Sequence, residues 1–488
     1  MTIKRNIFAN YVGRAYSIAA TYIFVPFYVQ ILGFEAYGVI AIYTVLLTLA
    51  GVADVGLSAA FSREAASCSD IRKLFSLMTT IERVIVACIS ILSLLIFMGA
   101  PFIAAHWLDL EGKIEQSSVL WAVRIMALML IPQMCIVLYS AGLIGLQKQV
   151  AANIIQSLFV TARSGFVVIL IYWQPDLHVF FGWQLIITLL TAVIIRCILA
   201  QAMGHASWEL GEFKTKLLRS NLSFAGGMMW ISIVSSINTQ ADKLIISNLF
   251  SITDLGYYSL ASVLSQLPIA LASPIAVAFY PYITKHVANK NKAQEELAYI
   301  TYGQWISFMG SLGAFTITFY SPQILTIWLQ EPNVPSVISE ITSILTVGSL
   351  FLCLAIPSYY LGLANGNSYL IALLATGTLI FSIPLIITAA IMFGLKGAAY
   401  PWIFLNVVNL VLLTVFVAWR SVGERITDCL FRVLALPIIA ALLPILSGRL
   451  LADSLNVSPI IECAIAAASA SIAVLGFVSL LRFKFVDL

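Results

Sequence analysis

Charged side chains inside long apolar segments are the residues of this chain that could do chemistry. The clearest of these charges are Arg14, Asp54, Arg124, Arg163, Arg196, Asp242 and Lys243. Each charge costs at least about 2.5 kcal/mol at the centre of a bilayer, so we expect each to face protein or water. Cations outnumber acids in this set, and a guanidinium group presents a planar fork of donors that suits phosphate oxygens. The residues therefore predict a water-filled, cationic cavity that binds an anionic head group.

Four of the cations are candidates for contact with that anionic group: Arg14, Arg124, Arg163 and Lys243. Arg163 lies near the middle of its segment, too deep to reach the membrane surface easily, which favours binding over a buried structural pair. Arg14 and Arg196 lie closer to one surface, where a long side chain can also extend to water. Asp54 lies at a depth similar to that of Arg14, so it either neutralises Arg14 or binds a coupling ion.

Asp242 and Arg124 lead to a hypothesis about gating. Both lie in the outer third of their apolar segments. We predict that they form an ion pair that closes the outer end of the cavity while the inner end is open. Neighbouring positions on a helix diverge by about 100°, so Lys243 cannot share the face of Asp242. Simple neutralisation of one charge by the other, without gating, is the alternative for this pair.

Other kinds of chemistry have no support in the sequence. The seven cysteines include no C-x-x-C pair and the four histidines are isolated, so neither a disulfide framework nor a metal site is predicted. We find no G-x-x-x-x-G-K-[ST] loop and no linked nucleophile, base and orienting group. We therefore expect neither an enzyme nor a cofactor. The net charge of +4 follows the membrane topology and does not indicate nucleic-acid binding.

The elements that position these charges are transmembrane helices. Hydrophobic residues make up 61% of the 488 positions and charged residues only 10%, and the mean hydropathy is +0.99. A soluble protein carries charge on roughly a quarter of its residues, whereas a bilayer accepts apolar helices because their backbone polar groups are satisfied internally. We predict an all-α polytopic membrane protein with about fourteen transmembrane helices. The expected ranges are 7–31, 38–61, 84–105, 118–142, 150–173, 180–203, 222–249, 256–284, 297–320, 338–362, 369–393, 397–419, 433–451 and 459–481.

The distribution of positive charge indicates how these helices are oriented. With the N-terminus in the cytoplasm, 18 of the 26 lysines and arginines lie in cytoplasmic segments. Only Lys113, Lys396 and Arg449, which lies at the outer end of its segment, are assigned to the outer side. Cytoplasmic loops carry an excess of Lys and Arg, so we expect both termini on the cytoplasmic side. The loops are short on both sides and leave no room for a catalytic domain outside the membrane.

The chain contains a repeated layout. The first apolar segment ends in the run L-G-F-E-A-Y-G at 32–38, and the seventh ends in I-T-D-L-G-Y-Y at 252–258. Six helices separate the copies, and an even number gives both halves the same orientation, so this is a parallel pseudo-two-fold repeat. We expect an N-terminal lobe at 1–210, a C-terminal lobe at 211–425 and two accessory helices at 426–488. Paired lobes are typical of alternating-access transporters, whose binding site lies between the halves.

Three motifs resemble those of one known family. The motifs are L-G-x-E-x-x-G, G-L-x-x-A-x-x-R-x-x-A, and D-K-x-I-I followed by L-G-Y-Y-S. The matching residues are Leu32, Gly33, Glu35, Gly38, Gly56, Leu57, Ala60, Arg63, Ala66, Asp242, Lys243, Ile245, Ile246, Leu249 and 255–259. In this order and spacing they are similar to the Wzx-type polysaccharide flippases of the multidrug/oligosaccharidyl-lipid/polysaccharide exporter superfamily. The two six-helix lobes and two accessory helices of that family would account for the whole chain.

The resemblance implies a flippase of the bacterial inner membrane. Such a protein moves undecaprenyl-pyrophosphate-linked oligosaccharide units to the periplasmic leaflet for O-antigen, capsule or exopolysaccharide assembly. The resemblance also implies a lipid-linked oligosaccharide as substrate, a coupling ion such as H⁺ or Na⁺, and a polymerase and other assembly proteins as partners. Two alternatives stay open: a multidrug/cation antiporter, which would favour an acidic or strongly apolar cavity, and a flippase for the lipid precursor of peptidoglycan, which charge alone does not exclude.

Overall fold

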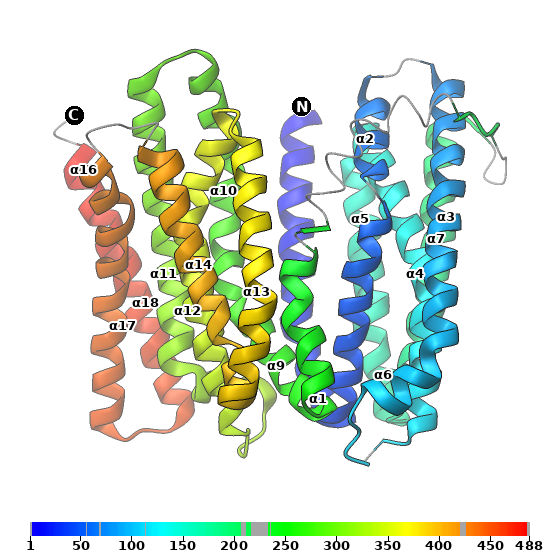
Figure 1. Cartoon of the computed structure of the whole chain (residues 1–488). Helices are drawn as coiled ribbons and strands as arrows, with labels where there is room; N and C mark the ends of the chain where they lie inside the picture. The colour runs from blue at the N-terminus through cyan, green and yellow to red at the C-terminus, as the bar shows by residue number, and fades with distance from the viewer. Residues whose placement is uncertain are drawn as a thin grey trace. The chain divides into compact units, whose positions relative to one another are not determined.

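The computed structural model describes residues 2–54, 56–67, 70–112, 114–205, 211–215, 233–234, 236–419 and 426–485. Within these ranges the chain is helical, and the only extended pairing is an isolated bridge between Asp109 and Ser251. A helix covers 236–249. The other elements (Figure 1) are α1 (Thr2–Ala50), η1 (Gly51–Asp54), α2 (Leu57–Ser67), α3 (Ile71–Phe102), η2 (Ile103–Trp107), α4 (Gln116–Gly145), α5 (Gln149–Val160), η3 (Thr161–Gly165), α6 (Phe166–Trp173), α7 (Leu177–Ala202), α9 (Ile252–Ser265), α10 (Leu267–Ala288), α11 (Lys292–Leu329), α12 (Ser336–Ala364), α13 (Ser368–Gly397), α14 (Tyr400–Leu413), η4 (Thr414–Ala418), α16 (Ile426–Leu430), η6 (Phe431–Ala435), α17 (Leu436–Leu455) and α18 (Pro459–Phe485).

The helices have the length and apolarity of membrane spans. Twelve stretches of the described residues qualify, from Ala15–Ala50 to Pro459–Leu481. The sequence predicts two more, and both differences have a local cause. The first two expected spans are joined in α1, and the seventh, 222–249, lies partly outside the described residues. The predicted all-α polytopic fold is confirmed.

Gly33 reverses the direction of α1. A straight helix of its 49 residues would be roughly 74 Å long, more than twice the approximately 30 Å of bilayer hydrocarbon. Gly33 has φ 85° and ψ 169°, which are outside the helical region. Glycine adopts positive φ without steric cost. Figure 1 shows that the two halves of α1 run in opposite directions on either side of this point. The turn lies inside the L-G-x-E motif, where the sequence analysis placed it.

The second expected span, 38–61, is not one helix. α1 ends at Ala50, η1 follows, and α2 begins at Leu57 after Gly56, which has φ 69°. Asp54 stabilises the new start, because its carboxylate accepts hydrogen bonds from the backbone N–H of Ser58 at 3.2 Å and from its hydroxyl at 2.6 Å. A carboxylate at a helix start offsets the unpaired N–H groups there.

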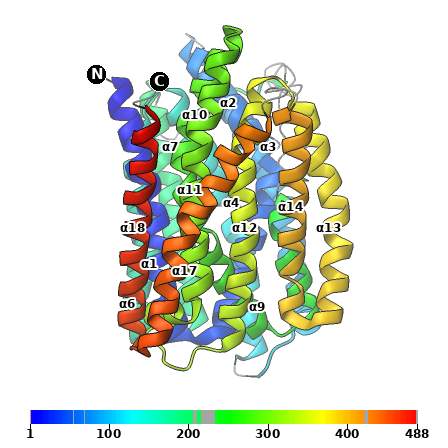
Figure 2. The ribbon, with the colours of Figure 1, turned by 90° about the vertical axis from the view of Figure 1, so that its left-hand side faces the viewer.

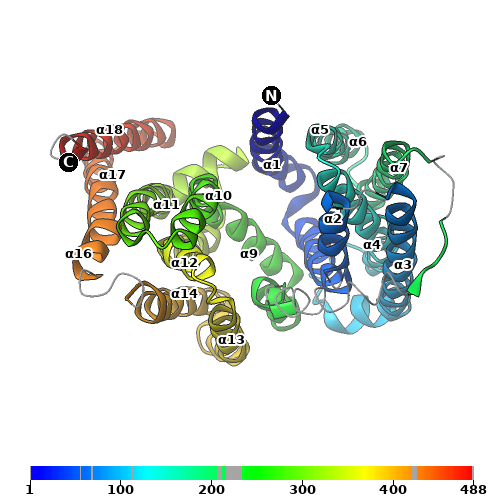
Figure 3. The same ribbon diagram turned by 90° about the horizontal axis from the view of Figure 1, so that it is seen from above.

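The chain divides into two compact units, Met1–Gly256 and Tyr257–Leu488. The division falls within α9. In the first unit, α4 packs against α2, α3 and α7, and these helices are seen end-on in Figure 3. Fully buried side chains such as Phe61, Phe75 and Leu130 form its core. The division into lobes at 1–210 and 211–425 and accessory helices at 426–488 stays a prediction.

In the second unit, α11 packs against α10, α12, α17 and α18. Figure 2 shows α17 and α18 side by side. Arg449 of α17 joins them, because its Nη1 lies 2.7 Å from Glu462 Oε2 on α18. Its Nη2 lies 2.7 Å from Asp453 Oδ1, and its guanidinium lies over the Tyr320 ring of α11 at 5.4 Å. One arginine thus ties the last two helices to α11.

The two copies of the repeated turn contact each other inside the first unit. A Cβ on Gly38 would overlap the carbonyl oxygen of Ile252, and a Cβ on Gly256 would overlap the carbonyl oxygen of Phe34. Each glycine lies four residues after the carbonyl of its own copy. The contact is therefore reciprocal, as it is between two identical surfaces related by a two-fold axis. This close approach of backbones explains why both copies carry glycine.

Candidate functional site

Arg163 lies on a π-helical turn in the middle of a span. η3 interrupts the helix between α5 and α6, and such turns occur frequently at functional sites. The Arg163 Nε donates to Gln184 Oε1 at 2.6 Å, and Gln184 Nε2 donates back to the Arg163 carbonyl at 3.1 Å. Its guanidinium lies 5.5 Å from the centre of the Tyr43 ring and 5.6 Å from that of Phe159. All of these partners are neutral.

Arg124 lies on α4 and is half-buried. Its guanidinium lies over the ring of Phe97 on α3, 5.2 Å from the ring centre. Among the described residues its buried Nε has no hydrogen-bond partner. A buried donor without a partner carries a desolvation penalty, which a bound anion would remove. The unsatisfied donor of Arg124 therefore makes this residue suited to bind an anionic ligand.

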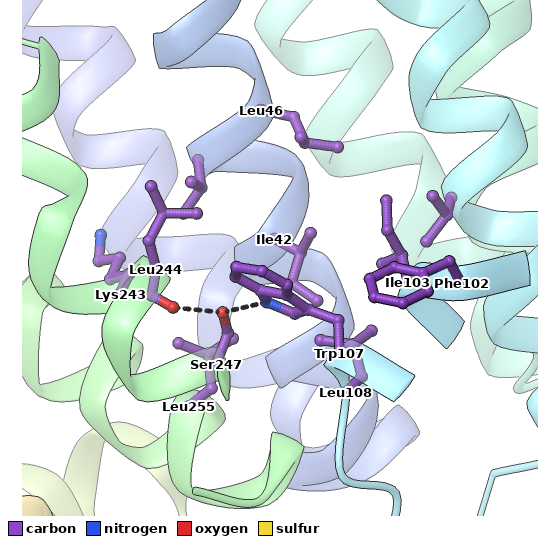
Figure 4. Close-up of a pocket in the computed structure, with 12 residues that line it drawn as sticks. Ile42, Leu46, Phe102, Ile103, Trp107, Leu108, Lys243, Leu244, Ser247 and Leu255 are labelled. Atoms are coloured by element: carbon purple, nitrogen blue, oxygen red, sulfur yellow. Dashed lines mark hydrogen bonds between the residues drawn. The ribbon is translucent and has the colours of Figure 1, made fainter. Parts of the chain in front are cut away.

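Lys243 borders a cavity in the first unit. The cavity has a volume of about 340 Å³, and Figure 4 shows it between α1, the end of α3 and the helix 236–249. Among the described residues that line it, Lys243 is the only charged one; the others are Ile42, Val45, Leu46, Phe102, Ile103, Trp107, Leu108, Val123, Leu244, Ser247 and Leu255. The sequence analysis selected Lys243 but contained no sign of the apolar cavity beside it.

Asp242 directs its carboxylate toward the backbone, because its Oδ1 accepts from the N–H of Lys243 at 2.8 Å. No ion pair within 4 Å joins Asp242 to Arg124 in the part of the chain that the structure describes. Both residues lie in the unit Met1–Gly256. The predicted gate stays a hypothesis about another state of the transport cycle.

Arg196 differs from the other cations because it has an acidic partner. Its Nε lies 3.1 Å from Glu82 Oε1, and the two side chains are only 13% and 17% exposed. The sequence analysis missed Glu82, since it placed the start of the third span at 84, whereas α3 begins at Ile71. The N-cap residue Asp70, followed by a long run without Gly or Pro, was the available signal. Arg196 is thus accounted for as half of a structural pair.

Two further predicted residues are Arg14 and Asp54. The side chain of Arg14, and with it the suggested neutralisation of Arg14 by Asp54, lies outside the described residues. Asp54 serves the start of α2, as described above.

The described cations that the sequence analysis selected thus fall into two groups. Arg196 is paired with an acid, whereas Arg124, Arg163 and Lys243 have no acid within 4 Å among the described residues. These three cations all lie in one compact unit. The Arg side chains among them can hold phosphate oxygens with two parallel hydrogen bonds.

The sequence was compared with known families and proteins. Residues 3–287 match the family described as "Polysaccharide biosynthesis protein". A protein of Shigella flexneri described as "Putative O-antigen transporter" is 27% identical over 413 residues, which cover 82% of this chain and 94% of that protein.

The fold was compared with solved structures. A structure of the lipid II flippase MurJ in an inward closed conformation has a TM-score of 0.75 at 15% identity, and the match covers 98% of this chain and 99% of that one. An inward-facing multidrug resistance MATE transporter of the MOP superfamily has a TM-score of 0.62 at 15% identity, covering 85% of this chain and 96% of that one. At these identities the likeness shows the fold.

Proposed function

The chain belongs to the polysaccharide biosynthesis protein family, and from this premise we propose that it is a flippase for lipid-linked oligosaccharides. It moves undecaprenyl-pyrophosphate-linked repeat units from the cytoplasmic to the periplasmic leaflet of a bacterial inner membrane, for O-antigen, capsule or exopolysaccharide assembly. The relative described as an O-antigen transporter supports this substrate class. The observation that carries the proposal is a group of three cations for which the described residues provide no ion pair within 4 Å: Arg124, Arg163 and Lys243.

These cations supply what the charged part of the substrate needs inside the bilayer. A pyrophosphate that leaves water loses its hydration, and cations inside the protein replace that hydration. Gln184 and the rings of Tyr43 and Phe159 hold the Arg163 guanidinium in place and, being neutral, do not neutralise its charge. The substrate anion is then the missing partner of these cations, and the lipid chain remains in the hydrocarbon while the head group crosses.

Orientation and energy supply belong to the same proposal. The charge bias of the loops supports cytoplasmic termini. No nucleotide-binding motif occurs in the sequence, so a coupling ion such as H⁺ or Na⁺, or removal of the product by a polymerase, gives the transport its direction. Polymerase and other assembly proteins would then be the partners on the periplasmic side.

Arg163 gives the sharpest test of this function. Proteoliposomes loaded with pyrophosphate-linked oligosaccharide lipid report the appearance of glycan on the opposite leaflet. We expect transport by the wild type and a loss of roughly ten-fold or more in Arg163→Ala, because a charge-assisted hydrogen bond contributes about 1.5–3 kcal/mol. Lys285→Ala, which removes an exposed cation at the end of α10, is the control and should retain transport.

The outcomes separate the alternatives. Exchange of organic cations for protons without glycolipid transport would support the multidrug antiporter and overturn the proposal. Transport of the lipid precursor of peptidoglycan in preference to the oligosaccharide lipid would replace the substrate but keep the role of Arg163.

A further inference from the structure

The turn that carries Arg163 departs from the hydrogen bonding of an α-helix. In η3 the N–H of Phe166 donates to the carbonyl of Thr161, five residues earlier. It is therefore not available to the carbonyl of Ala162, which would be its partner in an α-helix. The turn lies in the membrane-spanning stretch Gln149–Trp173. A carbonyl that loses its helical partner inside a membrane is stabilised by a donor from a neighbouring helix.

Two side chains of α7 donate to this turn. Trp183 Nε1 donates to the Ala162 carbonyl at 2.8 Å, and Gln184 Nε2 donates to the Arg163 carbonyl at 3.1 Å. Adjacent residues of α7 thus bond to adjacent carbonyls of η3. Gln184 is buried, and its Oε1 also accepts from the Arg163 Nε at 2.6 Å. Gln184 therefore holds both the backbone and the side chain of Arg163.

The third donor comes from α1. The hydroxyl of Tyr28 donates to the Ser164 carbonyl at 2.8 Å, and Tyr28 is buried. Its ring packs edge-on against Phe180 of α7, with the ring centres 5.3 Å apart, which limits the movement of the hydroxyl. Figure 3 shows α5 and α6 between α1 and α7, and η3 packs against both of these neighbours. Three consecutive carbonyls, 162–164, are therefore bonded from two sides.

The direction of the Arg163 side chain depends on this turn. A π-helical turn contains one residue more than the α-helical turn it replaces, which corresponds to about 100° of helical rotation shared over the turn. In the observed register the guanidinium lies against the Tyr43 ring and uses its Nε for Gln184. Its Nη1 and Nη2 make no hydrogen bond to any residue that the structure describes. These terminal nitrogens can form paired hydrogen bonds with phosphate oxygens.

We propose that the three donors are positioning residues, which hold the turn in its π-helical register and thereby direct the Arg163 guanidinium toward the pyrophosphate of the substrate. The three are Tyr28, Trp183 and Gln184. The inference rests on the proposed function, which assigns Arg163 to the substrate, and it adds the regulation of that contact. Without the donors the carbonyls regain α-helical partners, the turn closes into an α-helix, and the guanidinium rotates away from the substrate.

Carbon-13 NMR of the full chain in nanodiscs tests the register without any substrate. Ala162–Arg163 is the only Ala–Arg pair in the chain. Alanine labelled with carbon-13 at its carbonyl, combined with nitrogen-15 arginine, therefore gives a single correlation signal, which reports the Ala162 carbonyl. We expect Trp183→Phe to move this signal, because it removes the hydrogen bond to that carbonyl. Tyr28→Phe should move it as well, although Tyr28 bonds two residues away, because the whole turn changes register.

Two exposed residues of α6 provide matched controls. Tyr172 and Trp173 are 77% and 86% exposed, so Tyr172→Phe and Trp173→Phe make the same chemical changes away from the turn. Both should leave the Ala162 signal unchanged. A signal that Tyr28→Phe does not move would overturn the inference, because Tyr28 would then have no part in setting the register.

A double-mutant cycle shows whether a donor acts through Arg163. We expect Tyr28→Phe to lower transport of the oligosaccharide lipid at low substrate concentration by roughly two- to ten-fold, as the loss of one hydrogen bond predicts. In the Arg163→Ala background the same change should have no further effect. Tyr172→Phe should preserve transport in both backgrounds. An equal loss from Tyr28→Phe in both backgrounds would show a purely structural role and overturn the inference.

Failure of this inference and failure of the proposed function give different results. If the wild type transports the oligosaccharide lipid but the Ala162 signal does not respond to Tyr28→Phe, the positioning role falls and the proposed function stands. If the wild type transports no oligosaccharide lipid although Trp183→Phe and Tyr28→Phe both move the signal, the proposed function falls. The assignment of the three donors to the register then stands.

Discussion

At the residue scale, the charges inside the spans are distinguished by their partners. Arg196 has Glu82 at 3.1 Å, whereas Arg163 is held by neutral Gln184 and two aromatic rings. In a buried ion pair, each charge is neutralised by the other and attracts an ionic ligand only weakly. A buried cation whose partners are neutral keeps its positive charge and can attract an anionic ligand. The first arrangement is structural, and the second supports our assignment of Arg163 to the substrate.

The Arg196–Glu82 pair allows a direct test of this distinction. Arg196→Met leaves the Glu82 carboxylate buried without its partner, which we expect to lower the free energy of unfolding by roughly 3–5 kcal/mol. The double variant Glu82→Gln/Arg196→Met should recover most of that loss. Thermal unfolding of the purified protein in detergent measures both effects.

The matched control is Lys73→Met, which removes a more exposed partner of Glu64 at 3.3 Å. Exposed ion pairs contribute at most about 1 kcal/mol, so this variant should unfold nearly as the wild type does. An Arg196→Met protein as stable as Lys73→Met would contradict the structural role of the pair.

At the element scale, the glycines of the two repeated motifs determine how closely α1, just after Gly33, and the start of α9 approach. Gly38 faces the Ile252 carbonyl and Gly256 faces the Phe34 carbonyl. Backbone carbonyls within helices cannot rotate away from an added methyl group, so the two elements would have to separate. The repeated glycines therefore act as a contact surface and not only as turn residues.

Alanine at either glycine tests this contact. We expect Gly38→Ala and Gly256→Ala to lower the melting temperature by similar amounts, because the contact is reciprocal, and to reduce transport. Gly99→Ala is the control, since nothing lies within 4 Å of the added methyl group on α3. Replacing an interior helix glycine by alanine contributes roughly 0.5–1 kcal/mol of stability. Tolerance of alanine at Gly38 but not at Gly256 would refute a reciprocal contact.

At the scale of the whole molecule, the proposed transport requires that the outer end of the cavity closes and opens in turn. The predicted Arg124–Asp242 pair is absent in this structure among the described residues, and the buried Arg124 Nε has no hydrogen-bond partner. An ion pair that forms in only one conformation lowers the free energy of that conformation relative to the other. It therefore increases the fraction of molecules in that conformation. Such a gate is tested by measuring transport, because a single conformation shows only one state of the cycle.

Exchanging the two charges is the measurement for this gate. Arg124→Asp and Asp242→Arg should each reduce transport in proteoliposomes, because each places two like charges at the closing contact. The double exchange restores the attraction and should recover transport. An equal loss in the double and both single variants would show that the residues act separately, with Arg124 serving the substrate alone.

The sequence by itself determined the membrane class, the approximate position of most spans, the turn at Gly33 and the candidate cations. It could do so because the bilayer imposes a minimum apolar length on each span and a charge bias on the loops. These signals are local, and each can be found without knowing which helices are neighbours.

Only the tertiary structure decided which charges have partners. Arg196 and Glu82 are 114 residues apart, and the cavity beside Lys243 combines α1, the end of α3, α4 and the helix 236–249. Helices that are apolar on most of their surface carry little periodic signal about which side faces protein. Their rotation and neighbours follow from packing of side chains and close approach at glycines such as Gly38 and Gly256. For that physical reason the sequence could name Arg163 and Lys243 as candidates, but it could not show that the partners of Arg163 are neutral or that an apolar cavity lies beside Lys243.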